Sequence, residues 1–259
     1  MVILGLVLTG LVVSLSQQLQ QRHLLDTRTT LAEANDALSA FVTANARLPC
    51  PATIGSNGLE ATTAPGTCTA AAGYLPAVTL GLSNLDANGL LDDGWADGSI
   101  RDNTGALNYP RAIRYSVARL TGTAQVNALT AASLGAGTPN AATRLTVGTA
   151  LAANNGLFVC RSSVGMIGAG NRCASAANTL ALNAVAVLWS QGPTGNDKLG
   201  NSADENQNAT QLTAPGIPRA FVMRDFAGAA APGGRFDDLV SWISWGSVAD
   251  KLMMAWQVP

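Results

Sequence analysis

The chain is poor in the side chains on which most enzymes and nucleic-acid-binding proteins depend. Among its 259 residues there is one histidine, lysine is scarce, charged residues make up 12%, and the formal net charge is −1. A basic stripe, the usual electrostatic footprint of a nucleic-acid-binding surface, is missing. His-Glu-x-x-His, a phosphate-binding loop and Gly-x-Ser-x-Gly are missing too. We therefore expect no nucleic-acid partner and no enzymatic activity.

Two arrangements remain as enzymatic alternatives, and both are weak. A nucleophile activated by histidine needs the imidazole in a cleft, whereas His23 lies in a segment suited to helix packing. A pair of carboxylates can hydrolyse a glycoside, and Asp237 and Asp238 are adjacent. Neighbouring residues of an extended chain point to opposite faces, however, so this pair does not predict such a site.

The first forty-six residues predict one long helix. No Pro or Gly occurs between Leu11 and Arg47, and Leu24, Leu31 and Leu38 recur every seven residues, with Ala34, Phe41 and Val42 near the same face. This helical spacing leaves one apolar stripe to pack against another element. Pro49 and Pro51 end the helix near Ala46, because proline cannot continue its hydrogen bonds. We expect a stalk at 1–46 and a globular α+β head at 47–259.

The apolar opening at residues 1–15 allows three interpretations. A transmembrane helix needs about 20 apolar residues, and this stretch is shorter. A secretory signal peptide needs a basic segment before its apolar run, and none precedes Val2. We favour the third interpretation, in which the sequence begins partway into a longer hydrophobic helix, because the helical pattern continues through Ser16 into Leu19 and Leu24.

Two stretches carry a family resemblance. Residues 2–22 and the turn Asn45-Ala-Arg-Leu-Pro-Cys-Pro51 resemble the N-terminal helix and the helix end of type IV pilins and type II secretion pseudopilins. Shorter pieces of the head are similar as well: Asp93-Gly-Trp95, Ser190-Gln-Gly-Pro-Thr-Gly195 and Phe236-Asp-Asp-Leu-Val-Ser-Trp-Ile243. The resemblance implies a pilin-like fold, with the long helix packed on an antiparallel sheet.

The same resemblance implies a structural function. The helix would anchor the subunit in the bacterial inner membrane, with a periplasmic head, and would later pack against other pilin or pseudopilin subunits in a type II secretion pseudopilus or type IV pilus. The glycine before the family's cleavage site and the glutamate at its fifth mature position are not in this sequence, so we expect a start upstream of Met1. The alternative is a secreted periplasmic or extracellular binding or hydrolytic domain with a cleaved signal peptide.

Patterns in the head predict its strands. We expect strands at 112–120, 156–160 and 181–190, the last apolar enough to be central, and an edge strand at 217–225 that starts near Pro218. Residues 52–73 are rich in Gly, Thr, Ala and Pro and predict a loop. Leu239, Val240, Trp242 and Ile243 are expected in the core, and a terminal helix is expected from Val248 to Trp256.

The four cysteines predict two local disulfides. Of the three possible connectivities we favour Cys50–Cys68 and Cys160–Cys173, because each pair brackets a loop-like stretch. Metal ligation is the alternative, but the chain has no Cys-x-x-Cys. Disulfides imply an oxidising compartment, in keeping with the periplasm or beyond.

A calcium loop is a further hypothesis, taken from the resemblance. In the major pseudopilin the loop after the corresponding strand binds calcium, and here Asp197, Asn201, Asp204 and Glu205 would supply the oxygen ligands. A solvated polar loop is the alternative, since no spacing fixes these ligands. For the Asp- and Gly-rich residues 86–98 we favour turns over a second calcium site.

Overall fold

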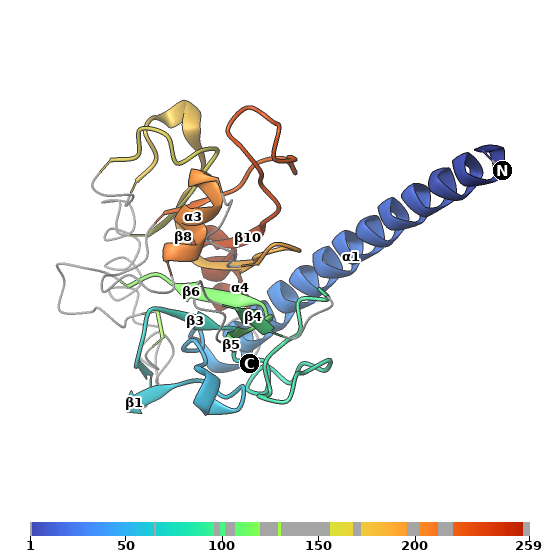
Figure 1. The fold of residues 1–259 in the computed structure, drawn as a ribbon. Helices are drawn as coiled ribbons and strands as arrows, with labels where there is room; N and C mark the ends of the chain where they lie inside the picture. The colour runs from blue at the N-terminus through green and yellow to red at the C-terminus, as the bar shows by residue number, and fades with distance from the viewer. Residues whose placement is uncertain are drawn as a thin grey trace.

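The computed structural model describes residues 2–64, 66–95, 99–101, 107–119, 129–130, 156–167, 172–195, 202–211 and 220–255. Its fold is α+β, with a long helix beside a curled sheet (Figure 1). The helices are α1 (Val2–Asn45), α3 (Ala203–Thr210) and α4 (Trp245–Ala255), with 3-10 turns at Ile54–Ser56 and Ala176–Asn178. The strands are β1 (Thr62–Ala64), β2 (Thr67–Cys68), β3 (Ala72–Tyr74), β4 (Ser99–Arg101), β5 (Leu107–Pro110), β6 (Arg114–Val117), β7 (Leu157–Cys160), β8 (Thr179–Ser190), β9 (Ala220–Val222) and β10 (Leu239–Ser244).

Helix α1 is continuous, and its N-terminal part projects beyond the head (Figure 1). It ends at Asn45, which confirms the predicted end within one residue. Ala46 has a φ of 52° and its N–H donates to the carbonyl of Val42 at 2.8 Å. A residue in this left-handed conformation closes the last turn of many helices. No described helix is both long enough and apolar enough to cross a membrane.

The apolar stripe of α1 is confirmed from Leu31 onward. Leu31, Ala34, Leu38 and Val42 are at most 5% exposed and belong to the core cluster that includes β8 and β10. Burying one leucine side chain contributes about 1.5–3 kcal/mol. The second half of α1 is therefore a core element of the head, while its first half extends away from it.

Strand β8 is the centre of the main sheet, as its apolar sequence predicts. Its N-terminal half pairs with β7, and its C-terminal half lies between β6 and β10, all antiparallel. The six residues from Ala184 to Trp189 are at most 1% exposed. The predicted strands at 112–120 and 156–160 correspond to β6 and β7.

The sheet departs from the expectation in two places. Strand β9 lies at an edge, as predicted, but it pairs with β7 in parallel, so the sheet is not purely antiparallel. The segment 52–73 contains the small hairpin β1–β2 and the start of β3, the opposite edge strand. These strands are two or three residues long, too short for an alternating pattern to reveal them.

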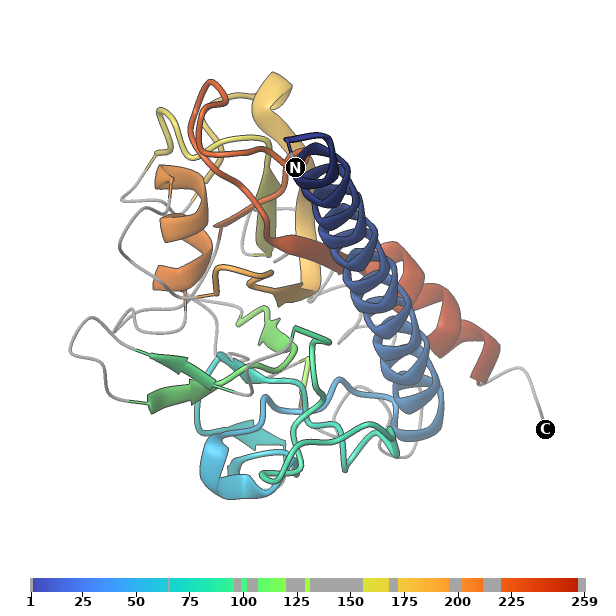
Figure 2. The same cartoon turned by 45° about the vertical axis from the view of Figure 1, so that its right-hand side comes forward.

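Helix α4 packs beside α1 on the same side of the head (Figure 2). It runs from Trp245, directly after β10, to Ala255 and so covers the predicted terminal helix except Trp256, which lies outside the described residues. Val240 and Ile243 of β10 are 7% exposed, and Leu239 and Trp242 pack against the same core. The structure confirms Val240 and Ile243 as core residues and has Leu239 and Trp242 partly buried against the core.

Both predicted disulfides are present, Cys50–Cys68 and Cys160–Cys173. Next to the first, the two guanidinium nitrogens of Arg47 bond the carboxylate of Glu60 at 2.6 and 2.8 Å, and the backbone N–H of Cys50 donates to the same carboxylate at 3.1 Å. The chain leaving α1 is thus held by one covalent and one ionic link within twenty-five residues of the helix end.

Candidate functional site

The head contacts α1 through Asp93 and Trp95. The hydroxyl of Thr27 donates to the carbonyl of Asp93 at 2.7 Å, and the rings of His23 and Trp95 lie 5.4 Å apart. The Asp93 carboxylate in turn accepts from the hydroxyl of Ser190 at 3.0 Å. Burial raises the pKa of Asp93, although the hydrogen bonds that its carboxylate accepts from the Trp95 N–H and the Ser190 hydroxyl oppose the shift. His23 thus packs against an aromatic ring.

The turn after β8 is fixed by contacts that require glycine at position 192. Gly192 has a φ of 61°, and a Cβ there would lie 2.2 Å from the carbonyl oxygen of Asp237. Thr194 donates its hydroxyl to the Asp237 carboxylate at 2.8 Å. Arg111 donates to the carbonyls of Gly192 and Pro193 at 3.0 and 2.9 Å. The turn is thereby attached to the chain that enters β10.

Helix α3 begins where the sequence predicted a loop. Ser202 and Glu205 form a capping box, in which the N–H of Glu205 donates to the Ser202 hydroxyl and the N–H of Ser202 donates to the Glu205 carboxylate, both at 3.2 Å. The spacing Ser-x-x-Glu was visible in the sequence and is the usual sign of a helix start. This signal could have located α3 without a structure.

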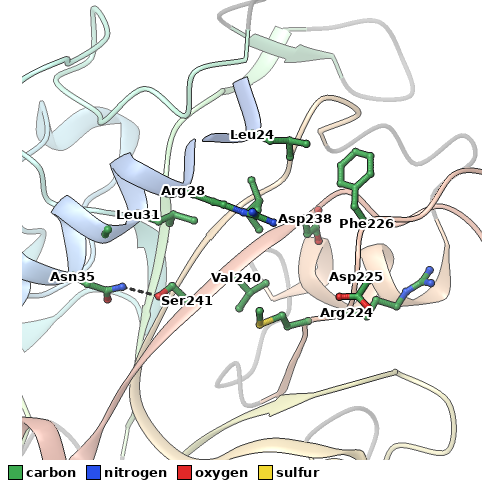
Figure 3. A pocket seen from close by; sticks show the side chains of 13 residues that line it. Leu24, Arg28, Leu31, Asn35, Arg224, Asp225, Phe226, Asp238, Val240 and Ser241 are labelled. Carbon is green, nitrogen blue, oxygen red and sulfur yellow. Dashed lines mark hydrogen bonds between the residues drawn. The ribbon is translucent and has the colours of Figure 1, made fainter. Parts of the chain in front are cut away.

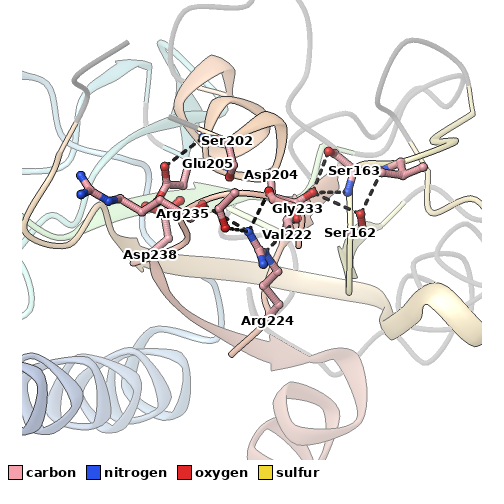
Figure 4. Close-up of polar contacts among 12 residues, drawn as sticks. Ser162, Ser163, Ser202, Asp204, Glu205, Val222, Arg224, Gly233, Arg235 and Asp238 are labelled. Atoms are coloured by element: carbon pink, nitrogen blue, oxygen red, sulfur yellow. Dashed lines mark hydrogen bonds and ion pairs between the residues drawn. The ribbon is translucent and has the colours of Figure 1, made fainter. Parts of the chain in front are cut away.

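Asp204 connects α3 to two other segments (Figure 4). One of its oxygens accepts from the backbone N–H and the hydroxyl of Ser163 at 2.6 and 2.7 Å, and the other forms an ion pair with Nε of Arg224 at 2.9 Å. Arg224 also donates to the carbonyl of Gly234 at 2.9 Å. A single carboxylate therefore joins the loop closed by Cys160–Cys173 to the chain after β9.

Three carboxyl groups in or next to α3 have raised pKa values. Burial, followed by the charge of Asp237, raises the pKa of Glu205 to about 7. Burial also raises the pKa of Asp237, and it raises that of Asp238 well above the ordinary value. Glu205 accepts from the N–H of Asp237 at 3.0 Å, so the neutral form of Glu205 still carries a carbonyl oxygen suited to this bond.

Asn208 bridges the two strand ends nearest to α3. Its side-chain N–H₂ donates to the carbonyl of Val222 at 2.8 Å and to the carboxylate of Asp238 at 2.7 Å, and its oxygen accepts from the N–H of Val222 at 2.7 Å. Asn208 is fully buried. Asp237 and Asp238 accordingly have different partners, Thr194 and Asn208, as expected for neighbours in an extended chain.

The proposed calcium ligands fall into two groups. Asp204 and Glu205 lie in the first turn of α3, where their oxygens accept from Ser163, Ser202 and Asp237. Asp197 and Asn201 lie outside the described residues. Within the described part of the chain, no three His, Cys, Asp or Glu side chains are grouped closely enough to hold a metal ion. The calcium loop stays a prediction.

Residues 86–95 form turns, in which Asp86 accepts from the N–H groups of Asn88 and Leu90 at 2.8 Å.

A cavity of about 340 Å³ lies between α1 and the strand ends that Asn208 bridges (Figure 3). Arg28 and Asn35 of α1 line one wall, and Asp238 lines the opposite one. Sequence reasoning did not identify this cavity, because its walls come from segments about 200 residues apart.

Comparisons with known proteins give no match: no family model, no curated protein and no solved structure is similar to this chain.

Proposed function

We propose that the protein is a non-enzymatic, pilin-like structural subunit that assembles with other subunits through α1. The observation that carries the proposal is the continuity of this helix. Its 44 residues combine a buried half, with Leu31, Ala34 and Leu38 in the head core, and a half that projects away from the head (Figure 1). An apolar helix that extends from its own domain gains stability by packing against other helices or lipid.

Three of the head segments that resemble pilins are linked to one another, and one of them contacts α1 near its middle. Asp93 and Trp95 contact α1, Ser190 binds Asp93, and the turn at Gly192 is bonded to Asp237. These contacts support the resemblance, because segments that are far apart in the sequence and each resemble pilins bond to one another in the fold. The proposal includes an inner-membrane or filament location with the head in an oxidising compartment, for which the two disulfides are suited.

Cysteine cross-linking tests the proposed assembly. Leu19 and Leu25 are 48% and 60% exposed on α1, and all four native cysteines are in disulfides. In the membrane fraction of producing cells, Leu19→Cys and Leu25→Cys should give oxidised dimers or mixed adducts with other subunits.

The matched control is Leu59→Cys, because Leu59 is 51% exposed and belongs to the head, not to α1. Adducts at positions 19 and 25 but not at 59 are expected. Equal cross-linking at all three positions, or at none, would contradict assembly through α1 and favour the secreted-domain alternative.

A further inference from the structure

The cavity between α1 and β10 is lined by four charged side chains, Arg28, Arg224, Asp225 and Asp238, of which Arg224 is paired with Asp204. Arg28 extends from α1 across the cavity toward Asp238 (Figure 3). The two side chains form no ion pair, and no other described carboxylate lies within ion-pair distance of Arg28. A guanidinium group presents planar N–H donors that match a carboxylate. The mouth of the cavity therefore offers a site for an anionic group.

Asp238 offers an acceptor on the opposite wall. It is only 7% exposed, and one of its oxygens accepts from Asn208 at 2.7 Å. The other oxygen has no hydrogen-bond donor among the described residues. A buried carboxylate is stabilised by donors on both oxygens, so this wall is suited to an N–H or ammonium group from a ligand.

A second buried polar atom lies unsatisfied further along the cavity. The side-chain N–H₂ of Asn35 donates to the hydroxyl of Ser241 at 2.6 Å, but its oxygen is buried without a partner. Native proteins leave few such atoms unpaired, and each one carries a desolvation cost. An unpaired acceptor in a cavity of this size is independent evidence of a polar ligand or an ordered water.

Most of the remaining cavity wall is apolar. Leu24 and Leu31 come from α1, Met223 and Phe226 follow β9, and Val240 belongs to β10. Phe226 is 53% exposed at the edge of the cavity. A volume of about 340 Å³ is at the lower end of known small-molecule sites, which enclose mainly apolar surface around a few polar groups.

We propose that this cavity binds an apolar α-amino acid. The carboxylate of the ligand pairs with Arg28, its ammonium group donates to Asp238, and its side chain packs against Leu31, Val240 and Phe226. The guanidinium group of Arg28 matches the carboxylate of this zwitterion, the Asp238 oxygen that does not bond Asn208 matches its ammonium group, and the apolar walls match its side chain. The site is independent of filament assembly, so each proposal can fail without the other.

Calorimetric titration of the full chain in mild detergent tests the proposal. L-Leucine and L-phenylalanine should bind with dissociation constants of about 1 mM or below. Leucinamide, which lacks the carboxylate, and N-acetyl-leucine, which lacks the ammonium group, should each bind about tenfold or more weakly. Glycine should give no measurable heat, because it lacks the apolar side chain. Equal binding of leucine and its two blocked forms, or no binding of leucine, would overturn the proposal.

Substitutions locate the site. Arg28→Gln should weaken leucine binding about tenfold and leave the weak binding of leucinamide unchanged. Arg22→Gln is the matched control, an exposed arginine of α1 outside the cavity lining, and it should bind leucine normally. Asp238→Asn gives the complementary result, a loss of the preference for leucine over N-acetyl-leucine. If Arg28→Gln lowers the melting temperature and leaves leucine binding intact, Arg28 pairs with Asp238 within the chain and the proposal is wrong.

Discussion

Two regions of the head each contain a disulfide and a glutamate that accepts a backbone hydrogen bond, but the pKa of the glutamate is lowered in one region and raised in the other. In the region below α1, Glu60 lies next to Cys50–Cys68 and accepts from the backbone N–H of Cys50. In the region around α3, Glu205 accepts from the backbone N–H of Asp237, and the neighbouring Asp204 holds the loop closed by Cys160–Cys173. The main difference is a directly bonded cation: Arg47 bonds Glu60, whereas Arg235 acts on Glu205 only through its charge and two carboxyl groups lie beside Glu205.

That difference reverses the direction of the pKa shift. Burial alone would raise the pKa of both glutamates. For Glu60, the hydrogen bonds from Arg47 and Cys50 outweigh burial and lower its pKa. For Glu205, burial and the charge of Asp237 dominate and raise its pKa to about 7. One guanidinium within hydrogen-bond distance decides whether a buried glutamate supports folding as an ion or as a neutral acid.

The largest expected effect comes from removing either disulfide. Replacing both cysteines of a pair by alanine should lower the free energy of unfolding by about 3 kcal/mol, since each bond closes a loop of similar length. Thermal unfolding of the two double variants measures this. Near-equal losses would show that the two regions differ in charge alone. A loss confined to one pair would mean that one loop stays ordered without its bond.

A smaller effect, on the order of 2 kcal/mol, is expected from Glu205→Gln, and it depends on pH. The folded pKa of about 7 exceeds the ordinary value of 4.5, so the unfolded chain releases this proton first. Wild-type stability should therefore fall as the pH rises from about 4.5 to 7. Glutamine cannot ionise, and its single oxygen can keep the capping-box bond from Ser202 but not also the bond from the Asp237 N–H.

The variant should lose part of this pH dependence and be more stable than the wild type at pH 8. Chemical denaturation at pH 5 and pH 8 measures the change. Asp237 and Asp238 contribute slopes of the same sign, so the variant should retain a residual slope. A variant that is less stable than the wild type at both pH values would contradict the raised pKa.

The smallest effect, about 1 kcal/mol, is expected from Glu60→Gln, with the opposite sign. The folded pKa of Glu60 is lowered, so its contribution is present above the ordinary pKa and is lost as the pH falls below it. The variant should be less stable than the wild type at pH 7, and the difference should shrink as the pH falls below the ordinary pKa of 4.5. The same denaturation series measures this, and equal stability at pH 7 would show that the Arg47 pair contributes nothing.

The sequence predicted correctly those elements that are determined by residue spacing within a single segment. The stripe at Leu31 and Leu38, the end of α1 before Pro49, the apolar β8 and the two disulfides all follow from spacing within one segment. The parallel pairing of β9 and the bridge made by Asn208 do not, because they join residues that the sequence separates and no spacing relates. Helix α3 is intermediate, since Ser202 and Glu205 indicated its start but the polar composition favoured a loop.

The carboxylate network shows the same limit. Asp204 and Glu205 were chosen as oxygen ligands, and the structure has them bonded to Ser163, Arg224 and Asp237. A sequence shows that carboxylates are present but not which donors reach them. The cavity between Arg28 and Asp238 was out of reach for the same reason, since its two charges come from opposite ends of the chain.

The uninterrupted course of α1 has a mechanical consequence. At 44 residues it is a rod of about 66 Å without a hinge, so tension applied at its N-terminal end reaches the head core undiminished. Leu31, Ala34, Leu38 and Val42 would be loaded together in shear, along the helix axis. Beyond the helix, Cys50–Cys68 withholds the residues between its cysteines from any extension. Under tension the head should therefore stay attached to α1, and the segment between Cys50 and Cys68 should not lengthen.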